Sequence, residues 1–283
     1  MFTRFFCYLL VLIMLPFYAP ANDTILWQTY HRPPGTFNFG ENKGQGFVQQ
    51  SLQMIIEQMP EYQHEMPTTT LARAIADIKA GKKACHPALY ITPEREKEMI
   101  FSNASILNAN NRVIARPEKI LPFLHNGQVS LEKILQQNSL VFGHVKNRSY
   151  GNLIDDIFKK YNQAENILQI DNIDLSRLFQ MIERERVDVS IAYPFEIHHY
   201  LKNNPQSTGQ LAAYAIANIP AYNIGAVACP KNAWGKKVIQ QVNTILKKIK
   251  PTAEYQAAVT AWRENERVNP AFIRYYLEYF LTH

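Results

Sequence analysis

Two arginines lie where a helix is expected to begin directly after a strand. Arg95 follows a threonine that can cap a helix and a proline that suits its first position, within residues 92–95. Arg148 and Ser149 stand between a predicted strand and a helix that opens at Asn152. Helix starts favour anions, and a guanidinium can hold a carboxylate through two parallel hydrogen bonds. These segments predict two cationic sites, one in each half of the chain, that face one anionic ligand across a cleft.

The alternative for Arg95 is an ion pair on a solvated face. Glu94, Glu96 and Glu98 are its close neighbours along the chain, and such exposed pairs are common. Tyr90 is a candidate ligand-binding residue. Tyr30, His31 and Tyr193 are candidates for a pocket wall, because they end predicted strands. For each of these three side chains, a place in the core is the alternative.

The sequence contains no strong catalytic or cofactor motif. There is no Gly-x-Ser-x-Gly elbow, no phosphate-binding lysine loop and no His-Glu-x-x-His pair. The eight histidines are scattered, and His198 and His199 are adjacent, so they point to different sides of a helix. Cys85 and His86 supply only half of a metal site. We expect neither a metal nor a cofactor.

The N-terminus has the pattern of a secretory signal peptide. Arg4 precedes an apolar run over residues 5–15, Pro16 ends it, and Ala19 and Ala21 are the small residues that a signal peptidase reads. The sequence predicts a signal peptide at residues 1–21. An uncleaved anchor is the alternative, but the run is shorter than the roughly 20 residues that span a bilayer. We therefore expect export to the periplasm.

After cleavage the chain keeps two cysteines, Cys85 and Cys229. An even pair in an exported chain favours a disulfide, and two buried thiols are the alternative. A bond that closes so long a loop would contribute roughly 4–5 kcal/mol on the chain-entropy model.

Predicted strands alternate with amphipathic helices along the rest of the chain. The first helix has Val48, Leu52, Ile55 and Met59 on one side, with a helical period. Such alternation predicts an α/β protein with largely parallel sheets. One domain or two lobes would suit the length, because no Ser- or Gly-rich linker divides the chain. The other segments are strands at 25–30, 84–91, 100–106, 112–116, 140–145, 187–193 and 222–229, and helices around 71–81, 153–161, 175–182, 238–249 and 273–280.

Composition excludes several classes of protein. With 47% apolar and 12% aromatic residues, the 283-residue chain is neither disordered nor collagen-like. The net charge of +6 is spread along the chain, whereas a nucleic-acid-binding protein concentrates basic residues on one face. No nucleic-acid partner is expected.

The chain resembles the family 3 extracellular solute-binding proteins, the two-lobed periplasmic receptors best known for polar amino acids. Four features carry the resemblance: Gly44-Gln45-Gly46-Phe47 entering a helix, Thr92-Pro93-Glu94-Arg95 with Phe101-Ser102 after it, Gly143 with Arg148-Ser149-Tyr150-Gly151, and Glu185-Arg186-Val187-Asp188 before a strand. The Thr-x-x-Arg element is the most specific of these. The resemblance is to a poorly characterised branch of the family.

The resemblance implies a type 2 periplasmic-binding-protein fold with a ligand cleft between two lobes. Residues 22–116 and 221–283 would form the first lobe and residues 117–220 the second, and the hinge would close on the ligand. Arg95 would grip the ligand's carboxylate, assisted by Arg148 and Ser149. The strands of Cys85 and Cys229 would be neighbours, which favours the disulfide.

Two departures from the family pattern concern the ligand. Amino-acid receptors usually have an acid after the strand that follows Asp188, where this chain has Tyr193, with Glu196 three residues later. The Ser-rich strand before the arginine is replaced by His86, Pro87, Ala88 and Tyr90. A ligand with an anionic group and a less polar remainder therefore fits better than an ordinary α-amino acid.

Three functions follow as hypotheses. The first is a monomeric periplasmic binding protein that presents a small anionic solute to a membrane transporter or sensor. The second is a secreted enzyme on the same fold, similar to cyclohexadienyl dehydratases, with Glu196 or His31 as general acid. The third is a sensory module that docks on a membrane signalling protein without transport.

Overall fold

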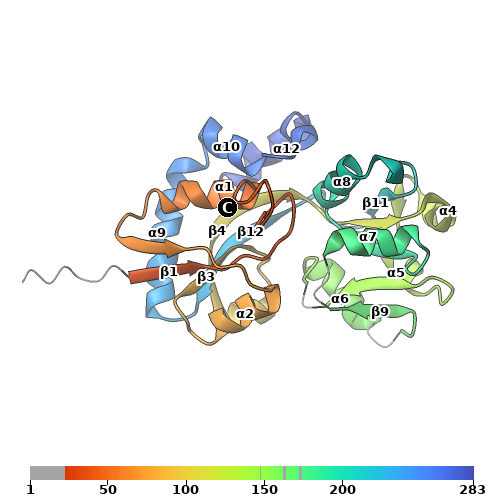
Figure 1. The fold of residues 1–283 in the computed structure, drawn as a ribbon, viewed down its shortest axis with the longest axis horizontal. Coiled ribbons are helices and arrows are strands. Elements are labelled where there is room, and N and C mark those ends of the chain that lie inside the picture. The colour runs from red at the N-terminus through yellow and green to blue at the C-terminus, as the bar shows by residue number, and fades with distance from the viewer. Residues whose placement is uncertain (1–22, 147, 162–163, 172–173) are drawn as a thin grey trace, which may run out of the picture.

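The computed structural model describes residues 23–283, except residues 147, 162–163 and 172–173. The predicted signal peptide lies outside the described residues. Helices pack on two separate sheets that lie side by side, one at each end of the molecule (Figure 1). The α/β class and the two-lobed arrangement are thereby confirmed. Within the described residues, no helix combines the length and apolar character needed to cross a membrane.

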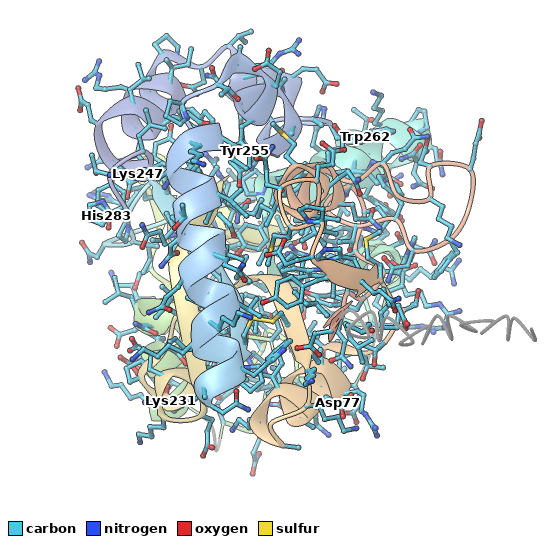
Figure 2. The ribbon with its side chains drawn as sticks, turned by 90° about the vertical axis from the view of Figure 1, so that its left-hand side faces the viewer. Asp77, Lys231, Lys247, Tyr255, Trp262 and His283 are labelled. Carbon is cyan, nitrogen blue, oxygen red and sulfur yellow. A yellow bond between two sulfur atoms is a disulfide. The ribbon has the colours of Figure 1, made fainter. Side chains whose placement is uncertain are left out.

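The first sheet has the strand order β2-β1-β3-β12-β4. β1 runs parallel to β2 and β3, and β12 runs antiparallel to β3 and β4. Figure 2 shows α9 along one face of this sheet. The elements of this lobe are β1 (Asp23–Trp27), α1 (Phe47–Ile56), β2 (Tyr62–Glu65), α2 (Leu71–Lys79), β3 (Ala84–Leu89), α3 (Pro93–Glu98), β4 (Met99–Ala109), β12 (Tyr222–Pro230), α9 (Ala233–Ile249), α10 (Ala253–Val259), α11 (Glu264–Arg267), α12 (Pro270–Tyr275) and a π-helical turn (Tyr276–Phe280).

The second sheet has the strand order β6-β7-β11-β5-β10-β8-β9. β8 runs parallel to β9 and β10, whereas β5 runs antiparallel to β10 and β11. Its elements are β5 (Arg112–Ala115), α4 (Pro117–Ile120), a 3₁₀ turn (Leu121–Phe123), β6 (Leu124–His125), β7 (Gln128–Val129), α5 (Leu131–Leu135), β8 (Phe142–Val145), α6 (Asn152–Lys160), β9 (Ile167–Ile170), α7 (Leu175–Glu183), β10 (Val189–Ala192), α8 (Pro194–Asn203), a second 3₁₀ turn (Pro205–Ser207) and β11 (Ala212–Ile216).

The expectation of largely parallel sheets is wrong at β5 and β12, and the short strands β6 and β7 also pair antiparallel, across a tight turn. The chain leaves the first sheet along β4, enters the second along β5 and returns from β11 along β12. Because β12 comes back directly beside β4, the two strands must run in opposite directions. The helices that connect the other strands allow parallel pairs, as expected.

The predicted division into residues 22–116 with 221–283, and 117–220, stays a prediction. The predicted boundary after residue 116 places β5 in the first lobe, but β5 belongs to the seven-stranded sheet of the second. We therefore propose that the second lobe begins after β4, near Asn110, and ends near Pro220, before β12.

Capping and packing explain why these helices form where they do. The hydroxyl groups of Thr70 and Thr92 accept hydrogen bonds from the first turns of α2 and α3; Thr92 is the predicted cap, and the sequence offers residues 68–70 as caps for α2. The apolar face of α1, including Val48, Leu52 and Ile55, is buried in the core of the first lobe. Each sheet thus has a buried core of its own, and Tyr193 and Phe195 from the second lobe join the core of the first.

The two remaining cysteines form the predicted disulfide. Cys85 on β3 and Cys229 on β12 are joined by an S–S bond of 2.01 Å, across 144 residues of sequence. Both side chains are fully buried in the core of the first lobe. The alternative of two free thiols is therefore wrong.

Candidate functional site

A small pocket of about 40 Å³ lies between residues of the two sheets. Its walls include Tyr30, Arg32, Tyr90 and Arg95 from the first lobe, and Arg148, Ser149 and Tyr193 from the second. The structure therefore brings Arg95 and Arg148 together, from segments on either side of β4 and β5. Tyr30, Tyr90 and Tyr193 come to the same place. Their role in ligand binding stays a prediction.

Arg95 is buried in this pocket without an acidic partner. It is 9% exposed, and its Nη1 donates a 2.9 Å hydrogen bond to the carbonyl oxygen of Tyr90. Among the described residues it forms no ion pair, and its neighbour Glu94 pairs with Lys159 instead. The alternative of a solvated ion pair is therefore wrong for Arg95. Burial lowers the pKa of Arg95, because removal from water disfavours the charged form.

Arg148, by contrast, has a strong partner. Its Nη2 donates a 2.7 Å hydrogen bond to Oε2 of Glu196, and the two side chains are only 7% and 1% exposed. The Glu196 carboxylate more than offsets the effect of burial and raises the pKa of Arg148. α6 begins at Asn152, as predicted, so Arg148 lies four residues before the helix, in the loop that leads into it.

Ser149 is held by an acid of its own lobe. Its hydroxyl donates to Oδ2 of Asp155, whose Oδ1 accepts a 2.8 Å hydrogen bond from the backbone N–H of Tyr150. The Ser149 oxygen also accepts a hydrogen bond from the N–H of Gly151. Burial raises the pKa of Asp155 in this position. Ser149 therefore orders the loop before α6 as well as lining the pocket.

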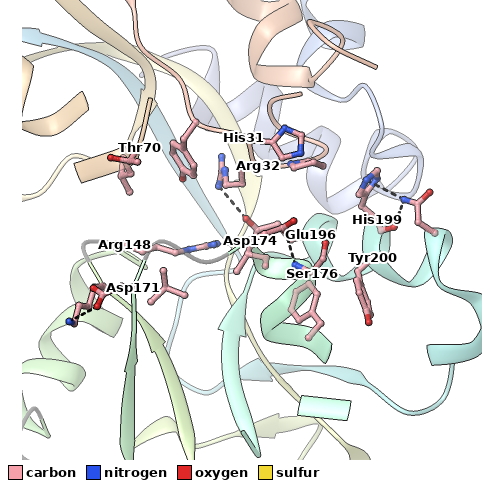
Figure 3. A pocket seen from close by; sticks show the side chains of 18 of the residues that line it. His31, Arg32, Thr70, Arg148, Asp171, Asp174, Ser176, Glu196, His199 and Tyr200 are labelled. Carbon is pink, nitrogen blue, oxygen red and sulfur yellow. Dashed lines mark hydrogen bonds and ion pairs between the residues drawn. The ribbon is translucent and has the colours of Figure 1, made fainter. Parts of the chain in front are cut away.

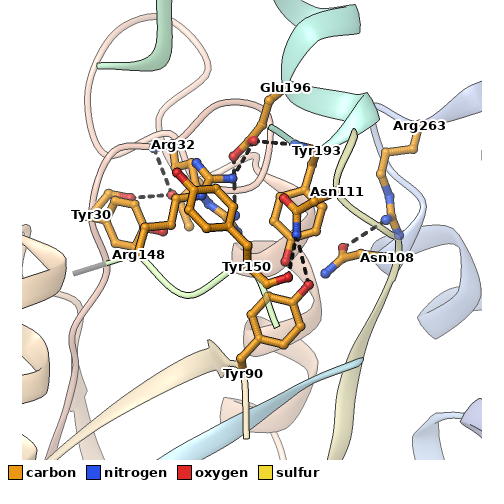
Figure 4. A network of polar contacts seen from close by, with 11 residues as sticks. Tyr30, Arg32, Tyr90, Asn108, Asn111, Arg148, Tyr150, Tyr193, Glu196 and Arg263 are labelled. Atoms are coloured by element: carbon orange, nitrogen blue, oxygen red, sulfur yellow. Dashed lines mark hydrogen bonds and ion pairs between the residues drawn. The ribbon is translucent and has the colours of Figure 1, made fainter. Parts of the chain in front are cut away.

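Arg32 is a site residue that the sequence reasoning missed. Its Nη1 lies 3.4 Å from Oε1 of Glu196, so one carboxylate joins Arg32 of the first lobe to Arg148 of the second (Figure 4). Its guanidinium also lies 5.7 Å from the ring centre of Tyr30 and 5.6 Å from that of Tyr193. The only signal was its place between His31 and Pro33 in a loop after a strand.

The tyrosines complete the wall of the small pocket. The rings of Tyr90 and Tyr193 are nearly parallel, with centres 6.4 Å apart, and Asn111 donates a 3.2 Å hydrogen bond to the Tyr90 hydroxyl oxygen. Burial raises the pKa of both tyrosines, so their hydroxyl groups stay protonated. Tyr193 also belongs to the core of the first lobe, which puts it in contact with both lobes.

A larger chamber of about 550 Å³ adjoins the small pocket (Figure 3). The two cavities share Tyr30, Arg32, Leu71 and Arg148 in their walls. The far side of the chamber comes from α7 and α8. His31, predicted to line the site, lies in this chamber, where it stacks on Phe39 with ring centres 3.7 Å apart. Burial lowers the pKa of His31.

The described residues offer no ready metal site. None of them form a group of three or more histidine, cysteine or acidic side chains placed to hold an ion. Glu196, the candidate general acid of the enzyme hypothesis, has both oxygens engaged by Arg32, Arg148 and the backbone N–H of Tyr193. In this geometry Glu196 is the counter-ion of Arg32 and Arg148.

Comparison with known protein families finds one that matches most of the chain. Residues 28–265 match the bacterial extracellular solute-binding proteins, family 3. The chain belongs to this family. The resemblance inferred from the Thr-x-x-Arg element is thereby confirmed, and the family is one of extracellular binding proteins. Among curated proteins, no match is found.

Solved structures similar to this family 3 protein show the same fold at low sequence identity. An ancestral arginine-binding protein bound to glutamine is 19% identical, with a TM-score of 0.66 over 86% of this chain and 99% of that one. The amino acid ABC transporter substrate-binding protein AbpA of Streptococcus pneumoniae, bound to L-arginine, is 17% identical, with a TM-score of 0.66 over 85% and 94%. A histidine kinase sensor domain is 13% identical, with a TM-score of 0.67 over 85% and 96%.

Proposed function

We propose that this family 3 protein is a monomeric periplasmic receptor that captures a small solute bearing a carboxylate between its two lobes. The observation that carries the proposal is Arg95, a buried guanidinium in the cleft with no acidic partner among the described residues. A buried charge is costly unless it is paired. A ligand carboxylate would supply that pairing, and Arg95 would bind it through charge-assisted hydrogen bonds.

The remaining predicted site residues support the same ligand. Arg148 and Ser149 reach the small pocket from the second lobe, and Tyr30, Tyr90 and Tyr193 enclose it. Binding across the cleft would favour closure, because the ligand then contacts both lobes. The closed receptor would present its solute to an ABC transporter permease or to a membrane sensor. Structures of the same fold include an amino acid ABC transporter substrate-binding protein and a histidine kinase sensor domain.

Isothermal titration of the chain without residues 1–21 against a set of small carboxylates tests the proposal. Arg95→Ala should weaken binding about 10- to 100-fold, because hydrogen bonds to charged groups contribute about 1.5–3 kcal/mol. Lys97→Ala is the matched control, because Lys97 is an exposed cation on the same short helix, two residues away. If Arg95→Ala binds with the same affinity as the unmodified protein, Arg95 does not bind the ligand's carboxylate.

A further inference from the structure

The small pocket has an unusual balance of charge in its walls. Three arginines line it, Arg32, Arg95 and Arg148, and among the described residues in its walls there is no aspartate or glutamate. Carboxylates lie outside these walls: Asp171 and Asp174 line the larger chamber, where Asp171 pairs with Lys146 and Asp174 caps α7. Glu196 faces the larger chamber, and Asp155 stands behind Ser149.

The oxygens of Glu196 and of Asp155 already accept from groups of the protein. Oε1 of Glu196 accepts a hydrogen bond from Arg32, and Oε2 accepts from Arg148 and from the backbone N–H of Tyr193. Oδ1 and Oδ2 of Asp155 accept from the Tyr150 N–H and the Ser149 hydroxyl. An ammonium group that shared an oxygen of Glu196 would lie beside the guanidinium groups of Arg32 and Arg148, and these like charges repel.

Other groups that attract a cation are also engaged. The ring of Tyr193 has the guanidinium groups of Arg32 and Arg148 at 5.6 and 5.5 Å, and the ring of Tyr30 has Arg32 at 5.7 Å. The carbonyl oxygen of Tyr90, in the pocket wall, accepts from Arg95. The pocket is rich in donors and poor in free acceptors.

We infer that this pocket selects carboxylates without an ammonium group, such as 2-oxo or 2-hydroxy acids, over the corresponding α-amino acids. The inference rests on the proposed function and names the substrate class of the same site. A carboxylate accepts from Arg95, and a neighbouring keto or hydroxyl oxygen can accept from a second donor of the wall. An ammonium group at that place would meet only guanidinium groups and hydroxyls, and like charges in a buried site repel strongly.

Titration with ligand sets that differ in one group tests the inference on the unmodified protein. The sets are L-alanine, L-lactate and pyruvate; L-glutamate, 2-hydroxyglutarate and 2-oxoglutarate; and L-phenylalanine, phenyllactate and phenylpyruvate. In any set that binds, the oxo or hydroxy acid should bind at least tenfold more tightly than the amino acid. An amino acid that binds as tightly as its oxo analogue would overturn the inference.

Variants at Tyr193 give a second measurement. Tyr193→Glu adds an acceptor to the pocket wall, and it should raise amino-acid affinity relative to hydroxy-acid affinity at least tenfold. Tyr193→Phe, which removes only the hydroxyl, should leave that ratio unchanged. If Tyr193→Glu does not fold, the comparison of ligand sets on the unmodified protein still decides.

The experiments distinguish failure of this inference from failure of the proposed function. Amino-acid binding that is lost in Arg95→Ala would overturn the inference and leave the proposed function standing. Binding that is unaffected by Arg95→Ala, or no binding by any carboxylate in the three sets, would overturn both.

Discussion

Arg32 and Glu196 face each other across the cleft, with Nη1 and Oε1 3.4 Å apart. Arg32 stands in the loop after β1 and Glu196 in the first turn of α8, so the contact joins the two lobes directly. The same carboxylate holds Arg148 at 2.7 Å. One acid therefore compensates two buried guanidinium groups.

Glu196→Gln should lower the free energy of unfolding by about 3–5 kcal/mol, because it leaves Arg32 and Arg148 buried without their counter-charge. Urea denaturation of both proteins measures this. Glu118→Gln is the control, since Glu118 pairs with Arg116 but is 65% exposed, and its loss should cost under about 1 kcal/mol. Equal losses in the two variants would contradict the role of Glu196 as a buried counter-ion.

The Cys85–Cys229 bond should contribute roughly 4–5 kcal/mol to stability, because it closes a long loop and so lowers the conformational entropy of the unfolded chain. Urea denaturation of the Cys85→Ser, Cys229→Ser double variant measures the loss. Addition of a reductant should bring the unmodified protein to the same stability, and it should not change the double variant. A reductant that also destabilises the double variant would show that its effect lies elsewhere.

His86 should make stability fall as the solution becomes acidic. Burial, with Arg32 and Arg95 nearby, lowers the pKa of His86 from 6.5 to about 3. Between pH 6.5 and pH 3, His86 is therefore protonated in the unfolded chain and neutral in the folded protein. The stability gained from this difference is full above pH 6.5 and is lost as the pH falls toward 3, by up to about 1.4 kcal/mol per unit.

Denaturation midpoints from pH 7 to pH 4 test this, with His86→Gln as the comparison. The variant should show a shallower decline than the unmodified protein over that range. His31, His144 and His199, whose pKa values burial also lowers, remain in both proteins, so the difference isolates His86. Parallel pH profiles would mean that His86 takes up a proton in the folded state as readily as in the unfolded chain.

Gly46→Ala should destabilise the first lobe by more than the roughly 1–3 kcal/mol that overpacking usually costs. A methyl group at Gly46 would overlap the backbone of Gly35 and Thr36, which packs on the start of α1. Gly40→Asn is the control, because Gly40 has open space around it and asparagine tolerates its φ of +82°. Thermal unfolding of the two variants compares them, and similar midpoints would contradict a steric origin.

The sequence allowed much of the fold to be predicted, because its signals are local. Helical periodicity located α1, and threonines at positions 70 and 92 marked the starts of α2 and α3. The disulfide followed from export and an even number of cysteines, and the family pattern added the neighbouring strands. The antiparallel course of β12 could not be read in this way, because strand direction depends on where the chain re-enters the sheet.

The candidate site was predictable only in part. Arg95 was found because it belongs to a local motif with a cap and a proline. Arg32 carries no periodic or capping signal, and its partner Glu196 is 164 residues away, so nothing local indicates the pair. Arg148 is 48 residues from Glu196, so nothing local indicated that Glu196 already compensates its charge.

The placement of the disulfide has a consequence for proteolysis. Every strand of the seven-stranded sheet lies between Cys85 and Cys229 in sequence. A protease that cuts once anywhere between these cysteines opens a covalent ring and releases no fragment. The nicked molecule would keep its mass on a non-reducing gel and separate into two bands only after reduction.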